Sequence, residues 1–158
     1  MANPKQQWLQ AFTGGFVATL LFHQGVLALF WLGGLIPAFP WNMTPVPPLG
    51  VPQVISLAFW GGVWGLPVWW IIRRWQSMKF WLSAIVIGAI GPTLVAMLLV
   101  FPMKGLDVNA TKVVGGLIVN AAWCLGLAGW MQFNRSRGSS LSPVLVCAPL
   151  QGASCARH

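Results

Sequence analysis

The sequence has almost no negative charge. Of 158 residues, only Asp107 is acidic, against nine Lys and Arg, and the charged fraction of 6% lies far below the about 25% of a soluble domain. The apolar fraction is 57%, and the apolar residues stand in long blocks. Such a chain cannot cover itself with a water-compatible surface, so we expect lipid to be its main solvent.

The shortage of acids also excludes most enzyme chemistry. General acid–base catalysis depends largely on His and carboxylate side chains, and the single carboxylate falls in a loop between apolar blocks. The sequence contains no Ser-His-Asp set, phosphate-binding loop or H-E-x-x-H motif. Its three cysteines, Cys124, Cys147 and Cys155, lack the spacing of a metal site. We therefore expect a protein that is not an enzyme and has no metal centre.

Four apolar blocks predict the fold class. A helix that crosses the ~30 Å hydrocarbon core of a bilayer needs about 20 mostly apolar residues. Four uncharged windows meet this length, and Pro67 and Pro92 predict bends in two of them. The sequence thus predicts an all-α, polytopic membrane protein with four transmembrane helices. These helices are expected at about residues 12–36, 54–72, 80–101 and 113–133.

The basic residues predict the orientation of the chain in the membrane. Seven of the nine flank the first block, link the second to the third, or follow the fourth, namely Lys5, Arg73, Arg74, Lys79, Arg135, Arg137 and Arg157. Only Lys104 and Lys112 fall on the other side. The positive-inside rule then places both termini and a tail at residues 134–158 in the cytoplasm. Since no basic surface stands apart from the helix flanks, we expect no nucleic-acid partner.

Tryptophan is abundant, with eleven residues, whereas tyrosine is absent. Most of the tryptophans fall near predicted helix ends, where indole prefers the headgroup level. Phe59, Trp60 and Trp64 lie deeper and predict an aromatic face beside small residues of the second helix. That face suits a lipid tail, a quinone, a pigment or a neighbouring subunit, and it equally suits the core.

Polar residues inside the apolar blocks are candidates for function, because they are costly in lipid. They are Thr19, His23, Gln24, Thr93 and Asn120. His23 suits several roles: an axial ligand of a haem or pigment, a proton relay, or a hydrogen bond between helices. A haem held by two histidines needs a second intramembrane His, and the only other histidine is the last residue. A pigment needs one axial ligand, so that alternative stays open beside the structural one.

The stretch between the first two helices is rich in proline. Residues 37–53 hold six of the twelve prolines and no charge. We expect a stiff, extended loop on the outer side. Trp41 and Leu49 make it apolar, so it should lie along the membrane interface, fold back over the bundle or dock on a partner protein.

The residues around this loop carry a resemblance. Pro47-Pro48-Leu49-Gly50-Val51-Pro52 is followed by Ser56-Leu57-Ala58-Phe59-Trp60-Gly61-Gly62 and preceded by Phe22-His23-Gln24. Over its first two helices the chain thus resembles a group of small, uncharacterised bacterial membrane proteins. The resemblance implies four helices and a bacterial inner membrane, and it implies no activity.

Three functions fit these observations. The first is a non-catalytic accessory subunit of a larger respiratory or photosynthetic membrane complex, in contact with lipid and with other membrane subunits. The second is a small, self-associating transporter or channel with a polar path near His23 and Asn120. The third is a haem- or pigment-binding enzyme component that uses His23.

Overall fold

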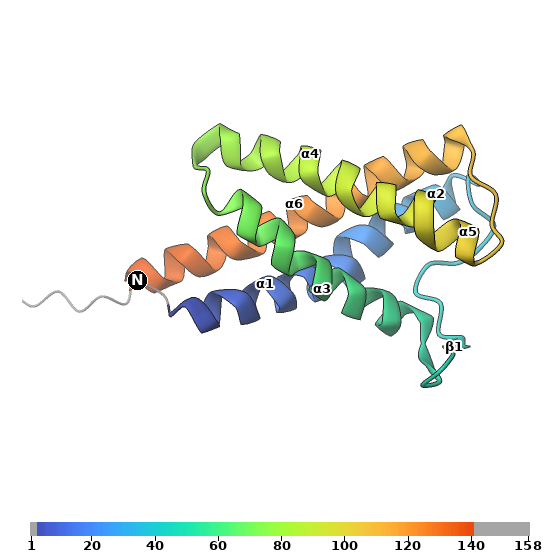
Figure 1. Ribbon diagram of the computed structural model, residues 1–158, viewed down its shortest axis with the longest axis horizontal. Coiled ribbons are helices and arrows are strands. Elements are labelled where there is room, and N and C mark those ends of the chain that lie inside the picture. Colours follow the sequence, from blue (N-terminus) through green and yellow to red (C-terminus); the bar gives the residue numbers. More distant parts are fainter. Residues whose placement is uncertain (1–2, 141–158) are drawn as a thin grey trace, which may run out of the picture.

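The computed structural model describes residues 3–140, and the side chains among them up to residue 136. The described chain is mostly helical and forms a bundle of long helices (Figure 1). Residues 141–158 of the predicted tail, with Cys147, Cys155 and Arg157, lie outside the described residues.

The bundle contains four long helices, two of which include a short π-helical segment. The first consists of α1 (Pro4–Ala18), η1 (Thr19–His23) and α2 (Gln24–Leu32), and the second is α3 (Gln53–Ile72). The third consists of α4 (Ser77–Val95), η2 (Ala96–Val100) and α5 (Phe101–Met103), and the fourth is α6 (Ala110–Ser140). All four are long and apolar enough to cross a membrane, which confirms the prediction of four such helices.

The first helix begins earlier and ends earlier than predicted. The side chain of Asn3 accepts a hydrogen bond from the Lys5 amide at 3.1 Å, and Pro4 occupies the first helical position, so α1 begins there rather than at residue 12. At the other end Gly34 adopts a φ of +69°, and α2 therefore stops at Leu32 rather than at residue 36.

The fourth helix is also longer than its apolar window. The Asn109 side chain accepts a hydrogen bond from the Lys112 amide at 2.9 Å, and this cap starts α6 at Ala110 rather than at residue 113. The helix continues to Ser140, so it includes the first residues of the predicted tail. Neither internal proline ends its helix, and η2 begins four residues after Pro92.

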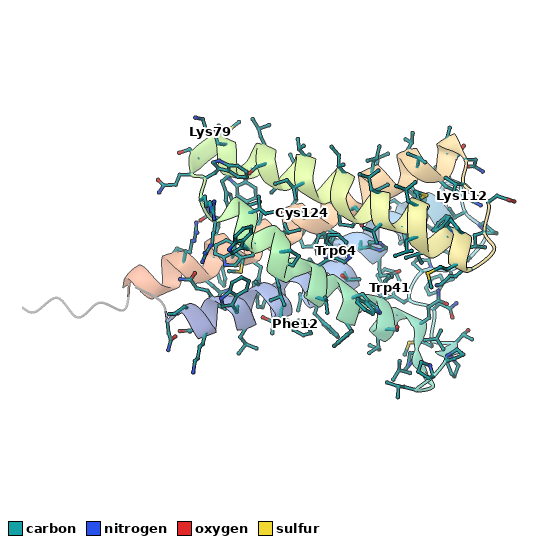
Figure 2. The ribbon with its side chains drawn as sticks, viewed as in Figure 1. Phe12, Trp41, Trp64, Lys79, Lys112 and Cys124 are labelled. Atoms are coloured by element: carbon teal, nitrogen blue, oxygen red, sulfur yellow. The ribbon has the colours of Figure 1, made fainter. Side chains whose placement is uncertain are left out.

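The helices pack unequally. α3 packs mainly on α1, α4 packs mainly on α6, and α1 and α6 join the two pairs, whereas α3 and α4 touch little. In Figure 1 the start of α1, the α3–α4 link and the end of α6 lie at one end of the bundle. We call this the basic end, and we call the opposite end, with residues 33–52 and 104–109, the loop end. Lys79 and Lys112 mark these two ends in Figure 2.

The α1–α3 crossing is a contact of backbone on backbone. A Cβ atom added to Gly15 would collide with the carbonyl oxygen of Gly61, and one added to Gly61 would collide with the Thr19 hydroxyl. A Cβ atom on Gly65 would collide with the carbonyl of Ala11. The Gly61-x-x-x-Gly65 spacing thus lets two helices approach closely, as small residues do between helices in lipid.

Small residues also shape the α4–α6 crossing. A Cβ atom added to Gly88 would collide with the Cβ of Cys124, and one added to Gly116 would lie 3.1 Å from the Thr93 methyl group. Cys124 is a free, buried thiol that fills this crossing. The two helix pairs are therefore built on the same principle, with glycine on one helix facing a compact side chain or backbone on the other.

The packed core lies toward the basic end. Large, fully buried side chains of α3, α4 and α6 meet there, and they are Trp69, Ile72, Phe80, Leu127 and Met131. Toward the loop end the surfaces are apolar and exposed, for example at Leu32, Leu98 and Met103. The largest fully buried side chains thus gather in one half of the bundle.

The Gly61 contact predicts a stability effect. Gly61→Ala should destabilise the bundle by about 1–3 kcal/mol, because the new methyl group must displace the Thr19 hydroxyl or the facing backbone. Gly25→Ala is the matched control in the first helix, since a Cβ atom at Gly25 would meet nothing within 4 Å. Unfolding in mixed micelles measures both variants, and equal stabilities would contradict the tight crossing.

Candidate functional site

Four of the five polar residues predicted inside the helices fall into two separate groups, and His23 belongs to neither. Thr93 and Asn120 lie between α4 and α6, whereas Thr19 and Gln24 lie on the first helix and interact there or with the following loop. Among the described residues no hydrogen bond joins the first group to the second or to His23. Direct side-chain hydrogen bonds therefore do not join His23 to Asn120, and the polar path predicted near them stays a prediction.

The Thr93–Asn120 pair is a bridge between helices. The Asn120 amide donates to the Thr93 hydroxyl at 2.9 Å, and Thr93 is buried. Such bonds between helices in lipid contribute on average about 0.6 kcal/mol. Beside the Thr93 methyl group lies Gly116, so the bond also fixes the register of the α4–α6 crossing.

Two side chains donate hydrogen bonds to the carbonyl oxygen of Gly15. The Thr19 hydroxyl donates to this oxygen at 2.9 Å, and the indole N–H of Trp123 donates to it at 2.9 Å. Thr19 lies against Gly61 of α3, and Trp123 comes from α6. One carbonyl oxygen therefore joins α1 to α6 at the place where α1 also contacts α3.

The outer loop returns to the first helix through Trp41. Its backbone N–H donates to the Gln24 side chain at 3.1 Å, and its indole N–H donates to the carbonyl of Leu20 at 3.0 Å. Leu20 lies within η1, whose π-helical turns change the register of the backbone hydrogen bonds. Trp41 has a φ of +57°, which is unfavourable for a bulky residue and persists only where contacts enforce it.

His23 is the last residue of η1 and is half-buried. Its Nδ1 atom is buried and has no hydrogen-bond partner among the described residues. A histidine that ligates a metal usually donates its second ring N–H to a carbonyl or carboxylate. No described contact therefore fixes the orientation of the ring through Nδ1, and the role of His23 as an axial ligand stays a prediction.

The loop, which was predicted to be stiff and extended, contains a small hairpin. Its strand β1 (Pro45–Val46) pairs antiparallel with β2 (Val51–Pro52). Gly50, with a φ of +65°, closes the turn by donating to the carbonyl of Val46 at 3.0 Å. Leu49 stands in this turn and is 81% exposed.

Asn42 ties the hairpin to the start of α3. Its carbonyl accepts from the Val54 amide at 3.0 Å, and its side chain donates to Gln53 at 3.0 Å. The neighbouring Trp41 binds the first helix, as described above. The hairpin is therefore held at its base by two helices, while its tip carries an exposed leucine.

The predicted aromatic face of α3 divides between surface and core. Phe59 and Trp60 are exposed, and the Phe59 ring makes edge contacts with Phe12 and Trp60 at 5.8 and 6.0 Å. Trp64 instead packs against the buried core and faces Gly91 of α4. Of these three residues, Phe59 and Trp60 offer an exposed surface to a lipid or a partner, whereas Trp64 is partly buried.

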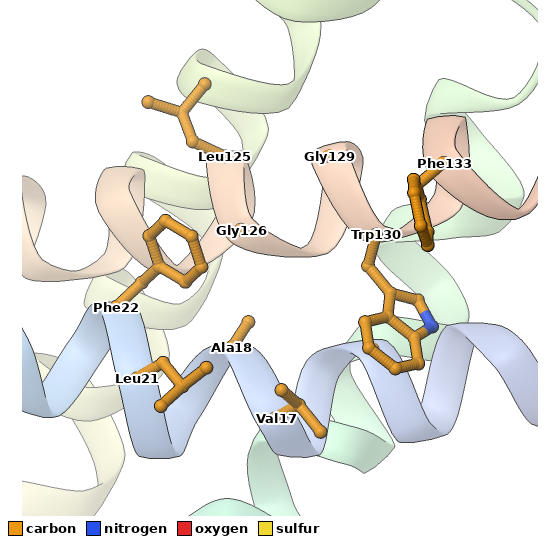
Figure 3. Close-up of a pocket in the computed structure, with 10 residues that line it drawn as sticks. Val17, Ala18, Leu21, Phe22, Leu125, Gly126, Gly129, Trp130 and Phe133 are labelled. Atoms are coloured by element: carbon orange, nitrogen blue, oxygen red, sulfur yellow. The ribbon is translucent and has the colours of Figure 1, made fainter.

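A groove of about 310 Å³ runs between the first helix and α6 (Figure 3). Gly126 and Gly129 remove side chains from its α6 wall, and the Phe22 ring lies over Gly126. The lining is apolar, which suits an acyl chain rather than a polar substrate. The lining residues are Gly14, Val17, Ala18, Leu21, Phe22, Leu125, Gly126, Gly129, Trp130 and Phe133.

The sequence did not reveal the roles of Trp41, Trp123 and the groove. Both tryptophans were visible as residues, but an indole N–H bond to a distant carbonyl leaves no periodic or motif signal. The glycines of α6 partly indicate the groove, because they leave space on that helix. Their spacing does not show whether another helix or an empty groove lies beside them. Within residues 3–136, no group of three or more His, Cys, Asp and Glu side chains gathers as a metal site.

Searches with protein-family models, among curated proteins and among solved structures found no match for this chain. The interpretation of its function therefore depends on its own residues.

The Trp41 anchor predicts a change in local stability. Trp41→Phe removes the indole N–H bond to Leu20, and amide hydrogen exchange over residues 42–54 should become about fivefold faster. Trp60→Phe is the control, because Trp60 donates no hydrogen bond in the described structure. Unchanged exchange in the Trp41 variant would show that this bond does not hold the loop.

Proposed function

We propose that this protein is a multi-pass membrane protein that acts as a non-catalytic accessory subunit of a larger membrane assembly, either respiratory or photosynthetic. The observation that carries the proposal is the hairpin tip at the loop end. An uncharged, apolar segment is held rigidly by two helices and presents Leu49 outward.

The orientation in the membrane follows from the two ends of the bundle. The basic end carries Lys5, Arg73, Arg74, Lys79 and Arg135, whereas the loop end carries Lys104, Asp107 and Lys112. Under the positive-inside rule the basic end and both termini face the cytoplasm. The hairpin then faces the outer side, and the resemblance of the first two helices supports a bacterial inner membrane.

The hairpin is suited to bind a protein. A turn exposed to water usually contains charged or polar residues, whereas this loop contains no charged residue. Its base is fixed by Trp41 and Asn42, so little conformational entropy is lost when the tip docks. Leu49 is the apolar anchor, and the exposed Phe59 and Trp60 offer a second contact within the membrane.

Transport or conduction is less well supported by the described contacts. Apart from His23, the predicted polar side chains of the helices bind one another, nearby backbone or the loop, and the groove beside α6 has an apolar lining. A pigment, haem or quinone contact depends on His23 or on the aromatic residues of α3, and it belongs to the same proposal of a subunit. Lipid contact is expected along the exposed apolar surface of all four helices.

Docking through the hairpin predicts the effect of a charge at its tip. Leu49→Glu should lower the affinity of the protein for its assembly at least about tenfold, because the carboxylate would be buried in the interface without a partner. Met103→Glu is the matched control, since Met103 is 78% exposed at the same end of the bundle, against 81% for Leu49. Quantitative co-purification in mild detergent compares the two variants with the wild type.

A photo-crosslinking residue at position 49 gives a second readout in native membranes. One membrane protein, crosslinked in stoichiometric amount, would identify the assembly. If the Leu49 variant keeps its partners, the hairpin is not the docking element. Recovery of the chain alone or with copies of itself would instead favour a small oligomeric transporter and call for flux assays.

A further inference from the structure

Two aromatic rings bound the apolar groove between the first helix and α6 (Figure 3). The Phe22 ring of the first helix lies over Gly126 of α6, where an added Cβ atom would collide with it. In the opposite sense, the Trp130 ring of α6 lies over Gly14 of α1. Each ring occupies the space beside a residue without a side chain, and the groove is the space that remains between the two rings.

The groove has a closed floor and an open mouth. Gly14 and Ala18 are buried at its floor, whereas Leu21 and Phe22 are exposed at its margin. A Cβ atom added to Gly129, which also lines the groove, would meet nothing within 4 Å. The groove therefore opens to the surroundings of the bundle.

The dimensions of the groove indicate its occupant. Its walls are residues 14–22 of the first helix and residues 125–133 of α6, and each wall is about 12 Å long at 1.5 Å per residue. Dividing the volume of about 310 Å³ by this length gives a mean cross-section of about 26 Å². An α-helix with its side chains is about 10–12 Å in diameter, or about 80–110 Å² in cross-section, so a partner helix does not fit. A single hydrocarbon chain fits, because its carbon atoms pack at about 4 Å from their neighbours.

The position of the groove along the helices favours a lipid chain over water. Both walls belong to helices that are long and apolar enough to cross a membrane. Apolar cavities stay free of water, because a bound water molecule needs about two to four polar partners. The length of about 12 Å also lies within the about 15 Å that one leaflet contributes to a hydrocarbon core of about 30 Å. One acyl chain of a single leaflet therefore matches the groove in length, width and polarity.

A hydrogen-bond donor stands at the end of the groove that lies toward the basic end. The indole nitrogen of Trp130 is on the side of its ring that faces away from Phe22 (Figure 3). This N–H group donates no hydrogen bond to another residue of the described chain, and Trp130 is partly exposed. Indole N–H groups in membrane proteins usually find an acceptor near the headgroup level. The ester carbonyl oxygen at the head of a phospholipid acyl chain is such an acceptor.

We propose that the groove binds one acyl chain of a membrane phospholipid from the leaflet at the basic end. The Trp130 indole N–H donates to an ester carbonyl oxygen of the same lipid. The lipid fills the space between the first helix and α6, the two helices that join the helix pairs of the bundle. The site lies apart from the hairpin tip and does not depend on the proposed function of the protein.

The test uses the full chain in nanodiscs of phosphatidylcholine that include a phosphatidylcholine probe with a diazirine in one acyl chain. After illumination, peptide mass spectrometry should find more probe on residues 14–22 and 125–133 than on Leu98, which is exposed on the outer surface. Gly129→Leu should lower this labelling to the level at Leu98, because the new side chain fills the groove. Gly25→Leu is the matched control and should keep the wild-type labelling, since a Cβ atom at Gly25 also meets nothing within 4 Å and Gly25 does not line the groove.

A second comparison preserves the packing and removes only the donor. Trp130→Phe keeps a ring over Gly14 and loses the indole N–H, so the lipid retained in native mass spectrometry should dissociate about fivefold faster. Trp60→Phe changes an exposed ring of α3 outside the groove and should leave this rate unchanged. This comparison decides the proposal even if Gly129→Leu impairs folding.

Three outcomes would overturn the proposal. Labelling of the groove no stronger than that of Leu98 in the wild type would mean that lipid contacts the groove only as it contacts the remaining surface. An equal dissociation rate in Trp130→Phe would mean that no ester carbonyl is bound there. Equally strong labelling by a diazirine fatty acid at the same concentration would mean that the groove takes a hydrocarbon chain without selecting a phospholipid.

Discussion

The close contact between α1 and α3 is the constraint on which the rest of the bundle depends. Because Gly15 and Gly61 have no side chains, the two backbones approach until the Thr19 hydroxyl fits between them. At the same crossing the Gly15 carbonyl oxygen accepts hydrogen bonds from Thr19 of the same long helix and from Trp123 of α6. A lipid environment offers no hydrophobic drive between helices, so close packing and such hydrogen bonds must supply the association.

Contacts of the first helix and of the core also position residues at the two ends of the bundle. η1 begins at Thr19, and its backbone provides the Leu20 carbonyl that receives the Trp41 indole, which in turn holds the outer hairpin. Toward the basic end, the core around Trp69 supports the guanidinium group of Arg135. The bundle thus holds an apolar hairpin at one end through Trp41 and the guanidinium group of Arg135 against the core at the other.

Sequence reasoning succeeded where the signal was local and failed where helices had to be rotated relative to one another. The four long apolar helices were predicted, but some of their ends were not: caps such as Asn3 and Asn109 extend two helices, and the first helix ends early, before Gly34. The polar residues were recognised, but the pairing of Thr93 with Asn120 and of Gln24 with Trp41 was not. Of the predicted aromatic face, Phe59 and Trp60 are exposed, whereas Trp64 packs against the core.

The sequence by itself determined the helical composition and the charge difference between the two ends, because both depend only on length, apolarity and the order of residues along the chain. Only the tertiary structure decided which face of each helix is buried, since lipid-facing and core-facing positions are both apolar and leave no periodic difference. It also decided that the loop folds back on the first helix at Trp41 and that the Arg135 side chain donates to the backbone carbonyl of Arg73. Those contacts join residues far apart in the sequence, and their formation depends on how the helices cross.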